Sequence, residues 1–112
     1  FDQFQKRGVN LIVCPRVSSS GKKIQLRFLF QELAKREITN ILIEGGARTI
    51  GAALQEKLVD KFLIFVAPKI MGDQNALSSI RGLEINRIDR LIKLHDVTVK
   101  QISEDILIEG YI

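Results

Sequence analysis

The stretch ILIEGGARTIGAAL, residues 41–54, places one acid and two adjacent glycines between two apolar segments. Residues 40–44 form a short apolar run, typical of a strand covered on both faces of a parallel sheet. Residues 48–59, after the glycines, show the apolar spacing of a helix, with Ile50, Ala53, Leu54 and Leu58 forming its stripe. The stretch therefore predicts a strand, a tight glycine turn and a helix. It leaves open whether the glycines serve only the turn or also a bound ligand.

The same alternation extends to both sides of this stretch. Residues 9–14 (VNLIVC) show a strand pattern that ends at Pro15, and residues 24–37 show the apolar spacing of a helix. Residues 61–67 (KFLIFVA) are a further buried-strand pattern, which Pro68 ends. Strand, helix, strand, helix and strand in this order predict two consecutive βαβ units with parallel strands and right-handed crossovers.

The pattern changes after Gly72. Residues 72–90 are irregular, and two strand patterns then follow at 91–101 and 105–112, joined at ISED. This arrangement predicts a closing antiparallel hairpin. The expected fold is therefore α/β, a mixed sheet with a βαβαβ core and a C-terminal antiparallel hairpin, within a single domain over residues 1–112.

Composition excludes several classes of protein. The 112 residues are 46% hydrophobic, which suits one domain with a real core, and no apolar run approaches the roughly 20 residues of a membrane helix. The net charge is +4, but the basic residues are scattered and no basic cluster contains aromatics, so we expect no nucleic-acid partner. Cys14 is the only cysteine, which rules out an intrachain disulfide and fits a cytoplasmic protein.

The glycine turn also has the features of an anion site. In parallel α/β sheets, ligands lie at the carboxyl ends of the strands, where Glu44 is expected. The start of the following helix presents unpaired backbone N–H groups and the positive end of the helix dipole, which together bind phosphate. Gly45 and Gly46 allow a ligand to approach the backbone closely. Neither the G-x-G-x-x-G fingerprint nor a P-loop is present.

Arg48 adds to this interpretation. A cation in the first turn of a helix opposes the dipole, and a bound anion would reverse that unfavourable interaction. Arg48 pointing into water explains the residue equally well, just as a simple turn explains the glycines and a solvated strand end explains Glu44. From the residues alone, a turn and an anion site therefore remain equal alternatives.

Several other polar residues have two interpretations. Ser18–Ser20 with Lys22 either meet a phosphate or form only a connecting loop, and Cys14 is either a nucleophile or a buried hydrophobe. Lys69 lies either near a ligand cleft or at the surface. His95 is the only histidine, which leaves the chain without a set of zinc ligands, so no metal site is expected.

Four pieces of the sequence together resemble a known family. They are Ile43–Gly46, Gly51–Leu54, Leu58–Lys61 and Ala67–Gly72. In this order they are similar to the pyrimidine reductase domain of bacterial riboflavin biosynthesis, which belongs to the bifunctional pyrimidine deaminase/reductase family. The final strand DILIEGYI (105–112) resembles the last strand of that family as well.

The resemblance implies a dihydrofolate-reductase-like fold and NADPH as cofactor. It implies reduction of 5-amino-6-(5-phosphoribosylamino)uracil to the ribitylamino product, with Glu44 at the substrate. By the family pattern, the cofactor-binding residues would be Gly45, Gly46, Ala47, Arg48, Thr49, Ile50, Gly51 and Ala52. Ala47 replaces a proline that is common in the family, a change of little consequence in a first helical turn. Members typically dimerise, so we expect a homodimer.

The sequence also departs from the family pattern. We expect it to correspond only to the latter part of such a domain, so its catalytic residues stay unassigned, and we expect weak cofactor binding without turnover by this fragment. Lys61 replaces an acid that is usual in the family. Two alternatives remain: a non-catalytic cofactor-binding or dimerisation fragment, pairing through an exposed edge at 105–112, and a related reductase with another substrate.

Overall fold

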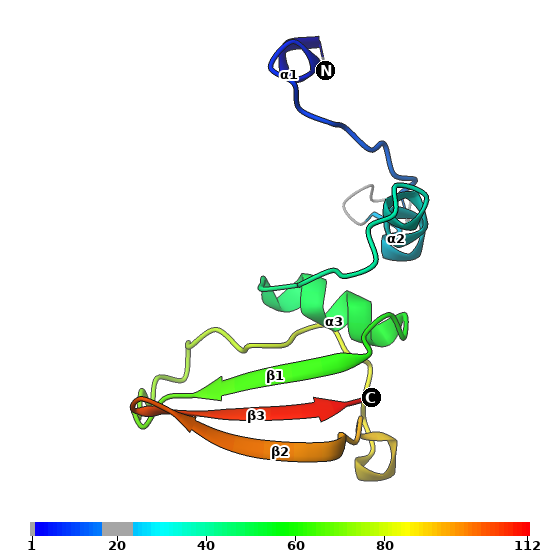
Figure 1. Cartoon of the computed structure of the whole chain (residues 1–112). Helices are drawn as coiled ribbons and strands as arrows, with labels where there is room; N and C mark the ends of the chain where they lie inside the picture. Colours follow the sequence, from blue (N-terminus) through cyan, green and yellow to red (C-terminus); the bar gives the residue numbers. More distant parts are fainter. Residues whose placement is uncertain (1, 17–23) are drawn as a thin grey trace. The chain divides into compact units, whose positions relative to one another are not determined.

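The computed structural model describes residues 2–16 and 24–112. The loop residues Ser18–Ser20 and Lys22 fall outside this part of the chain. Contacts divide the chain into two compact units, Phe1–Ile43 and Glu44–Ile112 (Figure 1). The second unit contains the predicted ligand-binding turn.

The first unit contains the helices α1 (Asp2–Gln5) and α2 (Leu26–Ala34). The sequence predicts a helix from residue 24, but Ile24 instead forms an isolated antiparallel bridge with Arg16. The next residue, Gln25, has an extended backbone, with φ −79° and ψ 103°, and its N–H donates to the carbonyl of Pro15 at 3.0 Å. These bonds delay the helix by two residues.

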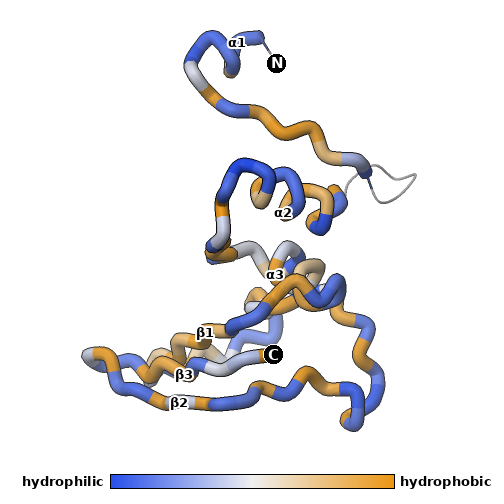
Figure 2. Tube along the Cα trace, turned by 45° about the vertical axis from the view of Figure 1, so that its right-hand side comes forward, coloured by the Kyte–Doolittle hydropathy of each residue, from blue (hydrophilic) through white to orange (hydrophobic). Residues whose placement is uncertain are grey.

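The end of α2 has a physical cause as well. Glu37 adopts a φ of 60°, and the N–H of Ile38 bonds back to the carbonyl of Leu33 at 3.1 Å. This left-handed closing turn is a common helix terminus, and it satisfies a carbonyl that the helix leaves free. Figure 2 shows α2 alternating between hydrophobic and hydrophilic segments. The apolar spacing that predicts this helix consists of four residues that lose exposure: Leu26 is buried and Leu29, Phe30 and Leu33 are half-buried.

The second unit contains one α-helix, one 3-10 turn and one β-sheet. Its elements are α3 (Ala47–Gln55), β1 (Lys61–Val66), the 3-10 turn η1 (Ile88–Arg90), β2 (His95–Ile102) and β3 (Asp105–Tyr111). The strands form a sheet in the order β1-β3-β2, and both ladders are antiparallel (Figure 1). The predicted helix at 48–59 is present but begins at residue 47 and ends at 55, and the predicted strand at 61–67 is present and ends at 66.

The predicted C-terminal hairpin is confirmed. Ile102 pairs with Asp105 across a two-residue loop, in which Ser103 has a φ of 56°. The register shifts between His95 and Thr98, which places one extra residue in β2. β3 lies between β1 and β2, so both of its edges are paired. The expectation that residues 105–112 form an exposed edge is therefore wrong.

The predicted parallel core is also wrong for the described residues. Residues 9–14 and 40–44 form no strand there, and all three recorded strands pair antiparallel. β1 pairs with β3 on one side only, so no strand contributes the parallel neighbour that a βαβ unit requires. Without such a neighbour the apolar runs stay exposed, as Val13 at 71% and Leu42 at 73% show. Figure 2 shows the first of these runs, residues 9–14, as a hydrophobic segment that precedes the grey trace and forms no strand.

One face of the sheet and α3 enclose the apolar core of the second unit. Ala53 and Leu54 of α3 are buried. A hollow of about 240 Å³ remains here, lined by Leu54, Phe62, Ile64, Ile80, Leu83, Ile85, Leu91, Ile92, Leu94 and Ile112. The helix α3, the strand β1, the residue after β3 and the irregular segment at 80–94 thus share one core. This packing fixes the irregular segment beside α3.

The other face of the sheet carries an ion network. Glu109 of the central strand accepts from Lys61 of β1 at 2.8 Å and from Lys100 of β2 at 3.1 Å. The Lys61 ammonium also lies 5.6 Å from the centre of the Tyr111 ring. The hydrogen bond from Lys61, followed by that from Lys100, lowers the pKa of the Glu109 carboxyl. The bond to Glu109 in turn raises the pKa of Lys61.

A pH dependence of stability follows from the lowered pKa of Glu109. The ionised Glu109 carboxylate stabilises the folded state fully above its unfolded pKa of about 4.3. This stabilisation is lost as the pH falls through the lower folded pKa. We expect the difference in thermal midpoint between the wild type and Glu109→Gln to shrink over that acidic range. Thermal unfolding scans from neutral pH downward measure it. Glu104→Gln, in the hairpin loop, is the control, and an equal pH dependence in both variants contradicts the prediction.

Candidate functional site

The glycine turn leads directly into α3. The Gly45–Gly46 peptide bond is cis, and Gly46 precedes the helix with φ −79° and ψ 177°. Positive φ values among the described glycines occur at Gly8, Gly72 and Gly82 only, so this pair is not required for left-handed backbone. A Cβ at either glycine would meet no atom within 4 Å. The pair therefore leaves open space beside the backbone, as close approach of a ligand requires.

The start of α3 offers free hydrogen-bond donors. The N–H groups of Thr49 and Ile50 both donate to the carbonyl of Gly46, at 2.9 and 3.1 Å. Those of Ala47 and Arg48 make no hydrogen bond within the described residues. No side chain caps the helix, and no acid lies in its first turn. The helix start therefore keeps its positive end uncompensated, which favours an anion.

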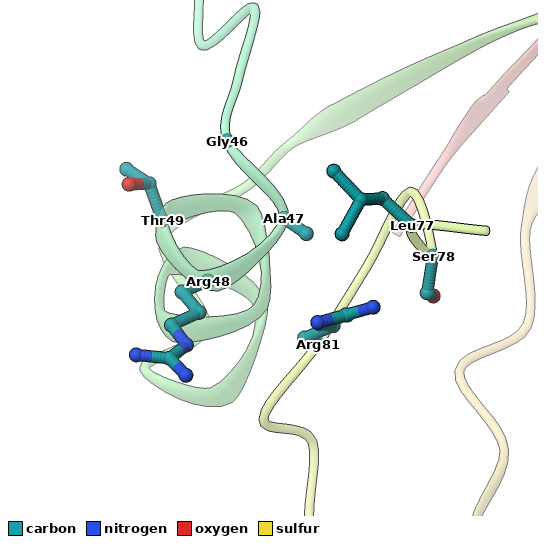
Figure 3. Close-up of a pocket in the computed structure, with 7 residues that line it drawn as sticks. All are labelled: Gly46, Ala47, Arg48, Thr49, Leu77, Ser78 and Arg81. Carbon is teal, nitrogen blue, oxygen red and sulfur yellow. The ribbon is translucent and has the colours of Figure 1, made fainter. Parts of the chain in front are cut away.

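A pocket of about 350 Å³ opens at this helix start. Its lining residues are Gly46, Ala47, Arg48, Thr49, Leu77, Ser78 and Arg81. In Figure 3 the side chains of Leu77, Ser78 and Arg81 lie on the side of Ala47, whereas Arg48 and Thr49 extend along the other side of the helix. Arg81 forms no ion pair with any described residue. Its guanidinium is thus available to an anion at the helix start.

The second wall of this pocket, residues 77–81, is held by the backbone and by one apolar anchor. The N–H of Arg81 donates to the carbonyl of Ala47 at 3.0 Å. The hydroxyl of Ser78 donates to the carbonyl of Ile80 at 2.6 Å, and the N–H of Ile80 lies 3.3 Å from that hydroxyl. The Ile80 side chain lines the apolar hollow beneath. These contacts place Arg81 next to the first turn of α3.

The structure brings together four of the residues expected to bind a cofactor. Gly46, Ala47, Arg48 and Thr49 line the pocket. The remaining predicted residues lie around them: Glu44 and Gly45 are exposed before the helix, Ile50 and Ala52 are half-buried within it, and Gly51 is buried. Glu44 does not line this pocket, which is consistent with a separate role from that of the helix start.

Sequence reasoning missed Leu77, Ser78 and Arg81. They lie in a segment with neither helical nor strand periodicity, so no pattern connects them to α3. One signal was present: Gly51 stands in the middle of a helix, where glycine is unfavourable unless something packs closely against it. A Cβ at Gly51 would lie 1.9 Å from the carbonyl oxygen of Arg81. The neighbour of this glycine is therefore the backbone of the missed segment.

The other polar candidates lie apart from the pocket lining. His95 is exposed on β2, Lys69 is exposed after β1, and Cys14 is half-buried in the first unit. Over residues 2–16 and 24–112, no cluster of three or more possible metal ligands occurs. The helices in the same ranges are all too short or too polar to cross a bilayer.

Comparison with known proteins gives a consistent assignment. The family model described as RibD C-terminal domain matches residues 2–108. The riboflavin biosynthesis protein RibD of Actinobacillus pleuropneumoniae is 33% identical over 108 residues, which are 96% of this chain and 28% of that protein. RibD of Aquifex aeolicus is 30% identical over 107 residues, 96% of this chain and 27% of its own length. This chain thus spans little more than a quarter of these relatives.

A solved structure agrees with the sequence comparisons. Acinetobacter baumannii RibD, form 2, superposes with a TM-score of 0.80 at 26% identity and covers 99% of this chain, which spans 28% of that structure. The predicted resemblance to the dihydrofolate-reductase-like reductase is therefore confirmed for the fold of this part. Together, these matches show that the chain belongs to the RibD C-terminal domain family of riboflavin biosynthesis.

Proposed function

We propose that this chain supplies the cofactor-binding part of an NADPH-dependent pyrimidine reductase. The reaction is the reduction of 5-amino-6-(5-phosphoribosylamino)uracil to its ribitylamino product. Membership in the RibD C-terminal domain family supports the reaction class. The observation that carries the proposal is the pocket between the first turn of α3 and residues 77–81. The chain acts within one reductase domain in the cytoplasm.

The residues of this pocket fit a dinucleotide phosphate. The free N–H groups of Ala47 and Arg48 and the positive end of α3 suit the pyrophosphate. Gly46 has no Cβ and leaves room for close approach. The Arg81 guanidinium adds a charge that pairs with phosphate in a planar, two-point geometry. NADPH supplies the hydride when bound, and the chain orients it.

The predicted residues divide between cofactor and substrate. We assign the cofactor to Gly45–Ala52, with direct contact from those that line the pocket, and the substrate to Glu44. Glu44 lies just before the glycine pair and is exposed, so its carboxylate is available to a polar substrate. A carboxylate can accept hydrogen bonds from amino and hydroxyl groups of such a substrate. No residue of this chain is assigned as a proton donor.

Titration of the complete protein with NADPH tests the proposal. Nicotinamide fluorescence should change saturably as the cofactor binds, and addition of the pyrimidine substrate should then consume NADPH. Binding without consumption would point to a related reductase, which a screen of pterin- and pyrimidine-like substrates identifies. Absence of NADPH binding by the complete protein contradicts a cofactor role for the chain.

A second candidate function is assembly. The outer edges of β1 and β2 carry no recorded partner strand in the described residues, and Leu63 and Phe65 of β1 are 43% and 62% exposed. Unpaired strand edges and exposed apolar side chains favour association with another chain. A homodimer is the form we propose, with β1 or β2 rather than the central β3 at its edge. Sedimentation of the complete protein with and without NADPH distinguishes assembly from cofactor binding.

A further inference from the structure

The backbone of Arg81 lies unusually close to α3 at one point. A Cβ built at Gly51 would lie 1.9 Å from the carbonyl oxygen of Arg81 and 2.9 Å from its carbonyl carbon. The obstacle is backbone rather than the end of a flexible side chain, so it cannot move aside alone. Residue 51 can therefore be only glycine while residues 77–81 keep their present position.

A second contact connects the same two segments. The N–H of Arg81 donates to the carbonyl of Ala47, one helical turn before Gly51, at 3.0 Å. Ala47 and Arg81 both line the pocket, whereas Gly51 does not. A side chain at residue 51 would push the Arg81 carbonyl outward and would strain this hydrogen bond with it. A substitution at Gly51 would thus change the pocket although Gly51 does not line it.

We propose that Gly51 is a positioning residue for the cofactor site. It allows residues 77–81 to dock on α3, and this docking fixes the Arg81 side chain beside the free N–H groups of the helix start. The inference rests on the proposed NADPH function, and it assigns to Gly51 an indirect role rather than contact with the cofactor. The phosphate-binding groups of the two walls must keep their spacing, since displacement by about 1 Å can cost on the order of 100-fold in activity.

The direction of the stability change in Gly51→Ala distinguishes this positioning role from the intrinsic helix propensities of glycine and alanine. Alanine is the best helix former and glycine among the worst, so a Gly→Ala change in an open helix stabilises the protein. At residue 51 the clash with Arg81 reverses that expectation. Gly51→Ala should lower stability and loosen residues 77–81, although it improves the intrinsic preference of α3.

Gly110→Ala provides a matched control. A Cβ at Gly110 would lie 2.8 Å from the Cβ of Leu94, so this variant also introduces a clash in the second unit. Gly110 and Leu94 do not line the pocket at the helix start. The control should therefore lower stability through the apolar core that Leu94 lines, without a clash against the backbone of Arg81.

The experiment measures hydrogen exchange and NADPH binding on the complete protein. In Gly51→Ala, the Arg81 amide should exchange at least about tenfold faster, and NADPH affinity should fall about tenfold, with KM for NADPH affected more than kcat. In Gly110→Ala, both quantities should match the wild type. If Gly51→Ala does not fold, Gly82→Ala reaches the same segment, because Gly82 has a φ of 87° that alanine disfavours.

Three outcomes overturn the inference. Wild-type exchange at Arg81 in Gly51→Ala would show that the segment is not held by this contact. Faster exchange with unchanged NADPH affinity would limit Gly51 to a structural role. Equal losses of affinity in Gly51→Ala and Gly110→Ala would indicate general destabilisation. Should the wild type bind no NADPH, the proposed function fails with the positioning role, while the exchange result still decides whether Gly51 holds residues 77–81.

Discussion

Replacing Gly46 with aspartate is expected to weaken NADPH binding by about 100-fold, because it puts a negative charge where the cofactor pyrophosphate would meet the helix start. Gly46 has an ordinary negative φ, and a Cβ there meets no atom within 4 Å, so the structure tolerates the change. Aspartate is also a preferred residue immediately before a helix. Stability should therefore be kept or rise by a few tenths of a kcal/mol while affinity falls.

The neutral amide of nearly equal size is the control for this variant. Gly46→Asn caps a helix about as well as aspartate and fills the same space without the charge. The affinity of Gly46→Asn should lie between those of the wild type and Gly46→Asp, which separates loss by crowding from loss by charge. Fluorescence titration with NADPH and a thermal scan on each protein measure both quantities. Wild-type affinity in Gly46→Asp would refute a backbone cradle at this turn.

The sequence predicted the parts of the fold whose signals are local. Pro68 ends β1, the two-residue loop after Ile102 joins β2 to β3, and the stripe through Leu54 defines α3. Each of these features needs only residues within a few positions of one another. The apolar runs at 9–14 and 40–44 differ, because apolar character indicates what a segment can bury but not which strand it pairs with.

In the candidate site, too, one wall follows from local sequence and the other from long-range packing. Its helix wall follows Glu44–Gly46 directly, and the donors and dipole of a helix start follow from the local sequence pattern alone. The other wall comes from residues 77–81, which are held beside α3 by Ile80 in the apolar core and by the hydrogen bond from the Arg81 N–H to the Ala47 carbonyl. Arg48 is the cation nearest to the glycine turn in the sequence, and the local pattern therefore points to it. Arg81 is the one whose side chain shares the space beside Ala47 with Leu77 and Ser78 (Figure 3).

Reversing the charge of Arg81 is expected to weaken NADPH binding by about 10- to 100-fold. A hydrogen bond to a charged group contributes about 1.5–3 kcal/mol, and a carboxylate in its place adds repulsion. Arg81→Glu should therefore lose more affinity than Arg48→Glu, whose side chain extends along the other side of the helix in Figure 3. Arg90→Glu, in η1, changes the net charge equally away from the pocket lining and should leave affinity nearly unchanged.

Salt and cofactor choice then identify what Arg81 contacts. A loss of NADPH affinity that comes from net charge alone reflects long-range electrostatics. It diminishes as added salt shortens the screening length to a few ångströms. A direct contact by Arg81 keeps most of its effect under those conditions. NADH lacks the 2′-phosphate of NADPH, so an equal loss for both cofactors in Arg81→Glu places the guanidinium at the pyrophosphate, and a loss for NADPH alone places it at the 2′-phosphate. Equal affinities of Arg81→Glu and Arg90→Glu would remove Arg81 from the site and leave the helix start as its only anion-binding element.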